Sequence, residues 1–331
     1  MNIIEINRRF STKEKCIEHL EKLRWNGSPV CPYCGMQNNI KIKSELRHHC
    51  YNCTRSFSVL VGTIFEDSRL SLHKYFTLIG LMLNAKQGIS SNEISRHIGV
   101  NNKTTWYACM RVRCGMVESV ENMIGRIEMD ETYVGGSPRK PNKKHADNQP
   151  SISSLSSTPN KRGRGTAKIG ITGIVERSGK KRITVKVMEA FRGNVMLAML
   201  KKHIKEENAT VITDAATHYK IFDKEVRHKI IKHAEQMVKG ELHTNTIDGF
   251  WRQIKTGIDG SYRAISEKYL PFYLTEFTYK YNRRNRRQDQ FNEYLRNALS
   301  DTNCMVNYQP KKDAKEIVYK TKKQKHGKRK K

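Results

Sequence analysis

Four cysteines in two tight pairs constrain the fold of this chain more than any other feature. Cys31 and Cys34 form the first pair, and Cys50 and Cys53 form the second after fifteen intervening residues. Four thiolates on two such knuckles can close a tetrahedron around one Zn²⁺, and this spacing is typical of a structural zinc ribbon. The thioredoxin-like context that a redox pair requires is absent. We therefore predict that these four cysteines bind structural Zn²⁺ and leave no coordination position open for catalysis.

The charge of the chain predicts a polyanionic partner. Its 331 residues include 62 Lys and Arg against 32 Asp and Glu, which gives a net charge of +30. Nucleic acid is the favoured partner, with ribosomal association or a membrane surface as weaker alternatives. No apolar run approaches the roughly 20 residues of a membrane span, and no signal-peptide core opens the chain. We expect a cytoplasmic, nucleoid-associated protein that has no membrane partner.

A helical region is predicted to follow the ribbon. Residues 89–100 have the form of a cap, a short helix and a glycine turn, and a second helix starts near Asn102. This order is typical of a helix-turn-helix, whose second helix presents polar residues to the DNA major groove. Two ordinary packed helices are the alternative. On the first interpretation the DNA-contacting residues include Lys103, Thr104, Thr105 and Arg111.

The second half of the chain has the pattern of an α/β layer with a mixed sheet. Between 139 and 168 the apolar periodicity is lost, and prolines, serines and a Lys-Arg run predict a mobile basic loop. The predicted order is a strand carrying Asp130, a hairpin, a helix, a strand ending at Asp214, a further strand and two long helices. The last residues, from 321, are mostly Lys and Arg and predict a disordered tail that contacts phosphates.

Acidic residues stand out in two of these strands. Around Asp130 apolar and acidic residues alternate, so Ile127 and Met129 would face a core while Glu128 shares the other face with Asp130. Asp214 ends an apolar strand, at the sheet edge where open α/β sheets bind ligands. A solvated strand edge and a turn or cap residue are the corresponding structural alternatives.

A third acidic residue lies on a predicted amphipathic helix. Thr244 or Asn245 could cap this helix, and Asp248 and Lys255 fall on nearly one side of it, two turns apart. An exposed polar position is the alternative for Asp248. If the strands and the helix converge at one sheet edge, their oxygen ligands suit Mg²⁺. Two such ions would stabilise the attacking and leaving oxygens of phosphoryl transfer.

Taken together, these segments resemble the insertion-sequence transposases of the DDE class, in particular the ISXO2-like group with an N-terminal zinc ribbon. The similarity covers about residues 10–290, and the run His243 to Lys255 is its most specific part. The other matching segments are CPYCG…CYNC, MDETYVGG, Thr213-Asp214 and Tyr281-Asn282-Arg283-Arg284. The resemblance implies a ribonuclease-H-like catalytic domain that cuts DNA and transfers the strand with Mg²⁺ or Mn²⁺. It also implies a homo-oligomer assembled on element ends and target DNA.

Carried over by motif, Asp130 and Asp214 match the first two acidic ligands of this family. Asp248 stands where most relatives have Glu, with 33 residues between it and Asp214, and we take it as the third ligand with Asn245 as the alternative. Lys255 resembles the basic residue that meets DNA phosphate. Because Asp is shorter than Glu, a DNA-binding regulator with a degenerate catalytic domain is a second hypothesis. A nuclease that cuts without joining is a third.

The predicted domains are a zinc ribbon with its leading helix (1–66), a helix-turn-helix-like region (67–120), a ribonuclease-H-like domain (121–290) and a basic tail (291–331).

Overall fold

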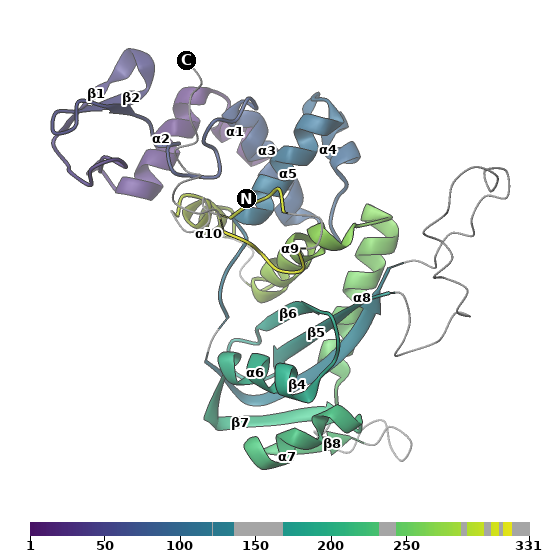
Figure 1. Cartoon of the computed structure of the whole chain (residues 1–331). Coiled ribbons are helices and arrows are strands. Elements are labelled where there is room, and N and C mark those ends of the chain that lie inside the picture. The colour runs from purple at the N-terminus through teal and green to yellow at the C-terminus, as the bar shows by residue number, and fades with distance from the viewer. Residues whose placement is uncertain are drawn as a thin grey trace, which may run out of the picture.

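The computed structural model of the protein describes residues 1–120, 122–135, 168–231, 243–285, 290–300, 306–310 and 314–319. Within these ranges the chain forms a small ribbon, a group of helices and an α/β layer (Figure 1). The predicted basic loop, apart from Lys168, and the tail from 321 onward lie outside the described residues. No helix in the described part of the chain combines the length and apolar character needed to cross a bilayer.

The N-terminal ribbon is a three-stranded antiparallel sheet in the order β1-β2-β3. Its elements are β1 (Asn39–Ile42), β2 (Arg47–Cys50) and β3 (Ser56–Phe57), preceded by α1 (Ile3–Arg9) and α2 (Lys13–Trp25). Glu21 of α2 joins the helix to the ribbon, because its carboxylate lies 3.0 Å from Nε2 of His48 and 2.6 Å from Nζ of Lys41. The ribbon is therefore held against the second helix.

Three helices follow: α3 (Leu72–Asn84), α4 (Ser91–Ile98) and α5 (Asn102–Cys114). Ser90 caps α4, Gly99 ends it in the left-handed conformation with φ 61°, and the Asn101 side chain caps α5 by accepting from the amide of Thr104. A cap, a short helix, a glycine turn and a capped second helix are thus present where the sequence predicts them. Their use as a helix-turn-helix on DNA stays a prediction.

The α/β layer contains a five-stranded mixed sheet in the order β6-β5-β4-β7-β8. Its strands are β4 (Met123–Val134), β5 (Ile169–Glu176), β6 (Ile183–Met188), β7 (Ile204–Asp214) and β8 (His228–Ile231). β5 runs antiparallel to both of its neighbours, β4 and β6, whereas β7 and β8 run parallel to β4. The predicted mixed sheet is confirmed, with β4 at its centre and β7 longer than expected.

The two faces of the sheet are covered by different helices (Figure 1). Ile127 and Met129 of β4 pack with α6 (Gly193–His203), Tyr219 and Phe222 on one face. On the other face, residues of β5 and β6 pack against α8 (Asn245–Gly257) and α9 (Leu270–Asn282). Glu128, Asp130 and Thr132 share this second face because side chains alternate along a strand. The strand thus presents a carboxylate-rich row to α8.

Helix α9 joins the α/β layer to the N-terminal helices. Leu274 and Phe277 pack towards the sheet, whereas Phe272 and Tyr279 belong to the core of the N-terminal helices. Between these layers Glu276 of α9 is 1% exposed and accepts a hydrogen bond of 2.8 Å from Nε of Arg113 on α5. The two layers therefore share one continuous interior.

The first part of the predicted basic tail (291–331) forms helix α10 (Gln290–Ala298). The buried residues of α10 recur at the helical spacing i, i+3, i+4, i+7. They are Phe291, Tyr294, Leu295 and Ala298, and they pack in the N-terminal helical core. Residues 290–298 therefore belong to the folded chain. This short amphipathic helix was not predicted from the sequence, because the C-terminal region as a whole is basic.

Candidate active site

Asp214 is the last residue of β7, and Asp130 lies four residues before the end of the neighbouring parallel strand β4. The register pairs Glu128 of β4 with Ile212 of β7, so extending it by two residues brings Asp130 level with Asp214. One oxygen of Asp214 accepts a hydrogen bond of 3.0 Å from the amide of Ala216, which holds the carboxylate at the strand end. The two adjacent parallel strands thus bring both carboxylates to the same part of the sheet, and their role as ligands stays a prediction.

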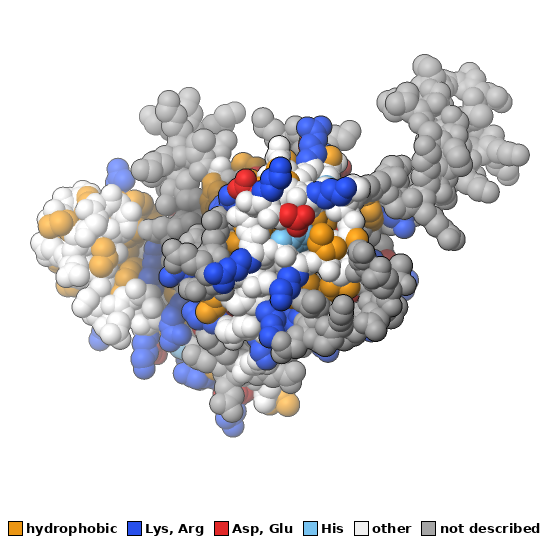
Figure 2. All heavy atoms as spheres, turned by 90° about the horizontal axis from the view of Figure 1, so that it is seen from below, with side chains coloured by type: hydrophobic (Ala, Val, Ile, Leu, Met, Phe, Trp, Pro, Cys, Tyr) orange, Lys and Arg blue, Asp and Glu red, His pale blue; other side chains and the backbone are white. Residues whose placement is uncertain are grey.

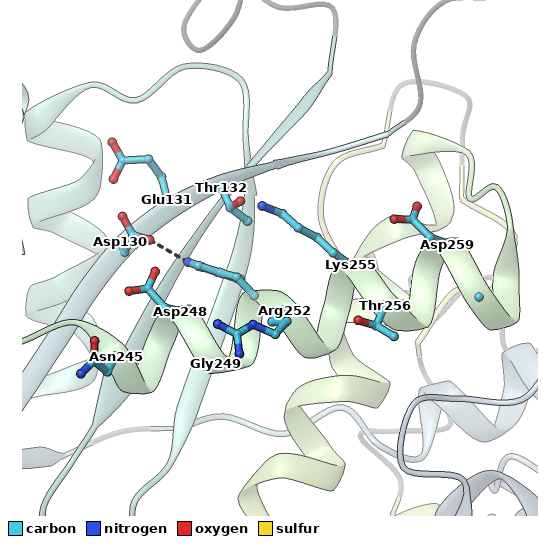
Figure 3. Close-up of a pocket in the computed structure, with 12 residues that line it drawn as sticks. Asp130, Glu131, Thr132, Asn245, Asp248, Gly249, Arg252, Lys255, Thr256 and Asp259 are labelled. Atoms are coloured by element: carbon cyan, nitrogen blue, oxygen red, sulfur yellow. Dashed lines mark hydrogen bonds between the residues drawn. The ribbon is translucent and has the colours of Figure 1, made fainter.

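Helix α8 brings Asp248 to the same edge (Figure 3). Asp248 lies in the first turn of the helix, where its carboxylate accepts a hydrogen bond of 3.3 Å from the Thr244 hydroxyl. One turn further, the indole N–H of Trp251 donates to Asp130 over 2.8 Å. The helix therefore holds one carboxylate of the group and contacts a second.

A groove of about 1220 Å³ opens between the end of β4 and the exposed side of α8. Asp130 and Asp248 lie at one end of it, and Arg252 and Lys255 follow along the helix (Figure 3). Its lining also includes Glu131, Thr132, Asn245, Gly249, Trp251, Thr256, Asp259 and Gly260. Asp214 is not among the lining residues. The groove thus combines an acidic end with two cations one and two turns away.

The acidic end carries unfavourable negative charge. The pKa of Asp130 is raised from 3.8 to about 6, chiefly by burial and also by the charges of Asp248 and Asp214, while the Trp251 hydrogen bond opposes the rise. A cation at this position would relieve the repulsion. The donors are all carboxylate oxygens, which suit Mg²⁺.

Glu128 contributes more to this region than its sequence pattern indicates. It is fully buried, and its carboxylate accepts hydrogen bonds of 2.9 Å from the amide of Ile247 and from the hydroxyl of Thr246. Burial raises its pKa, and these two donors together with Arg177 and His243 oppose the rise. The strand alternation places Glu128 on the face of Asp130, but no sequence signal connects it to α8.

Glu131 turns to the opposite face of β4. Its carboxylate lies 2.9 Å from Nε2 of His218 and accepts a hydrogen bond from the Tyr219 hydroxyl. Tyr219 belongs to the core on the α6 side of the sheet. Of the two acidic neighbours in Asp130-Glu131, only Asp130 contacts α8 through Trp251.

The four ribbon cysteines have the geometry of a zinc centre. All four sulfur atoms lie within 4.8 Å of one another, and the pairs Cys31–Cys53 and Cys34–Cys50 are separated by 3.6 Å. Zn–S bonds of about 2.3 Å in a tetrahedron require sulfur separations of about 3.8 Å. The residues therefore fit Zn²⁺ without rearrangement, with all four positions taken by thiolates.

Comparison with known proteins covers both the ribbon and the α/β layer. The family description "ISXO2-like transposase domain" matches residues 122–282, and "Transposase zinc-ribbon domain" matches residues 11–56. Residues 122–282 are an ISXO2-like transposase domain. It is 25% identical over 277 residues to an uncharacterized protein in transposable element ISH50 of Halobacterium salinarum, an alignment that covers 81% of this chain and 90% of the relative. The resemblance and the zinc ribbon predicted from the sequence are confirmed.

Two of the predicted DNA contacts of the transposase lie on the inside of its helical region. Thr105 is fully buried, and its hydroxyl donates to the carbonyl of Asn101 over 3.0 Å. The guanidinium of Arg111 is half-buried and lies 5.5 Å from the centre of the Tyr308 ring. Lys103 is exposed and Thr104 is partly exposed. The predicted DNA contact of Thr105 is therefore corrected. Its side chain is buried in the core, although that of Thr104, one residue earlier, is partly exposed.

Gly173 makes room for the contact between α8 and Asp130. It pairs with Asp130 across β5 and β4, and an added Cβ would lie 2.6 Å from the Trp251 ring. We expect Gly173→Ala to lower the free energy of unfolding by about 1–3 kcal/mol through overpacking. Gly249→Ala is the control, because a Cβ there meets nothing within 4 Å and Ala favours helix by about 0.5–1 kcal/mol. Urea unfolding measures both changes, and equal effects of the two substitutions would contradict the prediction.

Proposed function

We propose that this protein is a DNA transposase that cuts at the ends of its insertion sequence and joins them to target DNA. The observation that supports this most is the parallel register that sets Asp130 beside Asp214, with Asp248 brought to the same edge by α8. In the proposal the α/β layer is a ribonuclease-H-like domain and these three carboxylates are its metal ligands.

The donor set fits Mg²⁺ or Mn²⁺, and Asp130, Asp214 and Asp248 would hold it. When bound, such an ion would act as a Lewis acid that activates the nucleophile and neutralises the leaving oxygen. The chain itself supplies position and charge. Trp251 orients Asp130, Thr244 orients Asp248, and the exposed Lys255 is placed two turns along α8 to bind a phosphate of the DNA strand.

The proposed reaction has two steps at phosphodiester bonds. Water first cuts the strand at the element's end and leaves a 3′-hydroxyl. That hydroxyl then attacks a phosphodiester of the target, which forms one new bond and breaks one old bond. No protein nucleophile is required, because positioning and electrostatic stabilisation can account for catalysis of phosphoryl transfer.

The DNA partner is supported by the distribution of charge. Lys and Arg side chains dominate the charged groups at the end of the molecule where β7, α7 (Phe222–Glu225) and β8 lie (Figure 2). Lys220, Lys224 and Lys229 are exposed there. We propose that the zinc ribbon and the helix pair α4–α5 recognise the terminal repeats, and that the protein acts as a homo-oligomer on paired ends.

The test is an assay on a duplex that carries the terminal repeat of the element. With Mg²⁺ or Mn²⁺ we expect a cut strand with a 3′-hydroxyl and, with target DNA, a joined product; EDTA should abolish both. Metal-independent binding of the repeat without cleavage would favour the second candidate, a DNA-binding regulator. This candidate is retained because position 248 carries Asp where most relatives have Glu. Cleavage without any joined product would favour a nuclease.

Substitutions at the start of α8 identify the third ligand. Both Asn245 and Asp248 line the groove, but only Asp248 carries charge that acts on Asp130. We therefore expect Asp248→Asn to lower the cleavage rate by about a hundredfold or more, since it removes a metal-binding charge. Asn245→Ala should change the rate only a few-fold. The reverse ranking in single-turnover assays would assign the role to Asn245.

A further inference from the structure

We propose that Glu128 is a positioning residue, whose buried carboxylate caps helix α8 from strand β4 and thereby sets the placement of Asp248 relative to Asp130. The inference deepens the proposed function and rests on it for the identity of the two reacting carboxylates. The capping contact itself can be measured without any activity.

Helix α8 has no capping hydrogen bond from its own N-cap side chain. The N-terminal amides of a helix lack partners within the helix and need acceptors from elsewhere. The N-cap residue Thr244 makes no side-chain capping bond, because its hydroxyl donates to Asp248 instead. Glu128 supplies the missing acceptor, at 2.9 Å from the amide of Ile247, and takes a second bond from the Thr246 hydroxyl. A carboxylate at this end also interacts favourably with the helix dipole.

The cap lies next to both carboxylates that it would position. Ile247 immediately precedes Asp248, and Glu128 precedes Asp130 by two residues on the same face of β4. The second contact, from Trp251 to Asp130, lies four residues along the helix. Four helical residues span about 6 Å and two strand residues about 7 Å. The two contacts therefore match in spacing and fix the first turn of α8 alongside β4.

A cluster of three side chains holds the cap in place: Glu128 is buried, and Arg177 and His243 are partly exposed. Nε of Arg177 lies 3.2 Å from Glu128, and Nδ1 of His243 lies 3.5 Å from it. Arg177 also bonds Nε2 of His243 over 2.8 Å. His243 directly precedes the N-cap, so the cluster reaches the chain where it enters α8. A single carboxylate thus connects β4, the end of β5 and the start of the helix.

Glu176 provides a matched control for this role. It is 1% exposed, accepts a hydrogen bond of 3.0 Å from the amide of Ile124 and lies 3.4 Å from Nε of Arg182. Like Glu128, it is buried, accepts a hydrogen bond from a backbone amide and lies beside an arginine. Its partners, however, belong to β4 and the β5–β6 connection and not to α8. A merely structural role of Glu128 predicts the same consequences for both substitutions.

The experiment compares Glu128→Gln with Glu176→Gln in the full, zinc-loaded chain. Hydrogen exchange of the peptide 243–257 reports the cap directly, and we expect faster exchange in Glu128→Gln alone. In single-turnover cleavage of the terminal-repeat duplex at saturating DNA, we expect Glu128→Gln to lose 10–100-fold in rate or in Mn²⁺ affinity. The affinity for the duplex should change less than about threefold, and Glu176→Gln should keep its rate within the same factor.

The outcomes separate the inference from the proposed function. Unchanged exchange at the start of α8, or equal rate losses in both variants, would overturn the positioning role. If the wild-type protein cuts no DNA but Glu128→Gln still speeds hydrogen exchange in α8, the proposed function would be overturned. The capping role of Glu128 would then still hold. Should Glu128→Gln fail to fold, Glu128→Asp keeps the charge but withdraws it by one methylene, and the same selective loosening of α8 is expected.

Discussion

Asp130→Asn should abolish cleavage, with a fall in rate of about a thousandfold or more, and should leave the fold intact. The loss follows because one of the two strand carboxylates no longer carries the charge that metal-assisted phosphoryl transfer needs, a contribution of several kcal/mol. The amide oxygen of Asn can still accept the hydrogen bond of 2.8 Å from Trp251. Single-turnover cleavage of the terminal-repeat duplex, together with gel-shift binding, measures the two effects separately.

The same substitution should stabilise the metal-free protein above about pH 4. The folded-state pKa of Asp130 is about 6, above its ordinary 3.8, so ionisation costs folding free energy as pH rises through this interval. Asn removes this cost. The gain should be absent below about pH 4, grow towards pH 6 and then level off on the order of 1 kcal/mol, after allowance for the partial exposure of the site. Urea unfolding in EDTA at several pH values measures it.

Asp259→Asn is the matched control for Asp130→Asn. Asp259 lines the same groove but follows Asp248 by eleven residues, about three helical turns. We expect its rate to stay within about threefold of the wild type, because exposed charges at this distance are screened. Comparable losses from the two substitutions would mean that the groove, and not its acidic end, determines the rate. Full activity of Asp130→Asn would exclude Asp130 as a ligand.

The parts of the site that depend on local pattern could be predicted from the sequence. Alternation along β4 predicts the shared face of Glu128 and Asp130, and an apolar run ending in Asp214 predicts a strand end. The cysteine spacing predicts the ribbon. In each case a short window carries the signal, because side-chain period and ligand spacing are local properties.

The parts that depend on contacts between distant segments could not be predicted. Glu128 and Ile247 are 119 residues apart, and nothing in either segment identifies the other as its partner. Thr105 follows a partly exposed residue on a polar helix start, and only packing of α5 against the core decides that it is buried. The apolar residues of α10 recur at helical spacing, which predicts a helix. Its position in the N-terminal core, however, depends on contacts with helices near the other end of the sequence.

Substitution of a zinc ligand should unfold the ribbon and leave the rest of the chain folded. The core of the ribbon consists of Cys31, Cys50 and Phe57, so two of its three buried residues are themselves ligands. Structural zinc contributes about 10–16 kcal/mol in small zinc domains, which so small a core cannot replace. We expect Cys50→Ser to lose bound zinc and hydrogen-exchange protection over 31–57. The helix α2 should persist, because Cys16, Ile17 and Leu20 pack in the larger helical core.

The control is Cys109→Ala, which removes a buried cysteine of α5 outside the cluster and should leave the zinc content unchanged. Because the α/β layer has its own cores, Cys50→Ser should retain metal-dependent nicking of non-specific DNA while its affinity for the terminal repeat falls at least tenfold. Asp130→Asn should show the opposite combination, with binding retained and nicking lost. Undiminished binding of the repeat by zinc-free Cys50→Ser would remove the ribbon from end recognition and leave α4 and α5 as the elements that contact DNA.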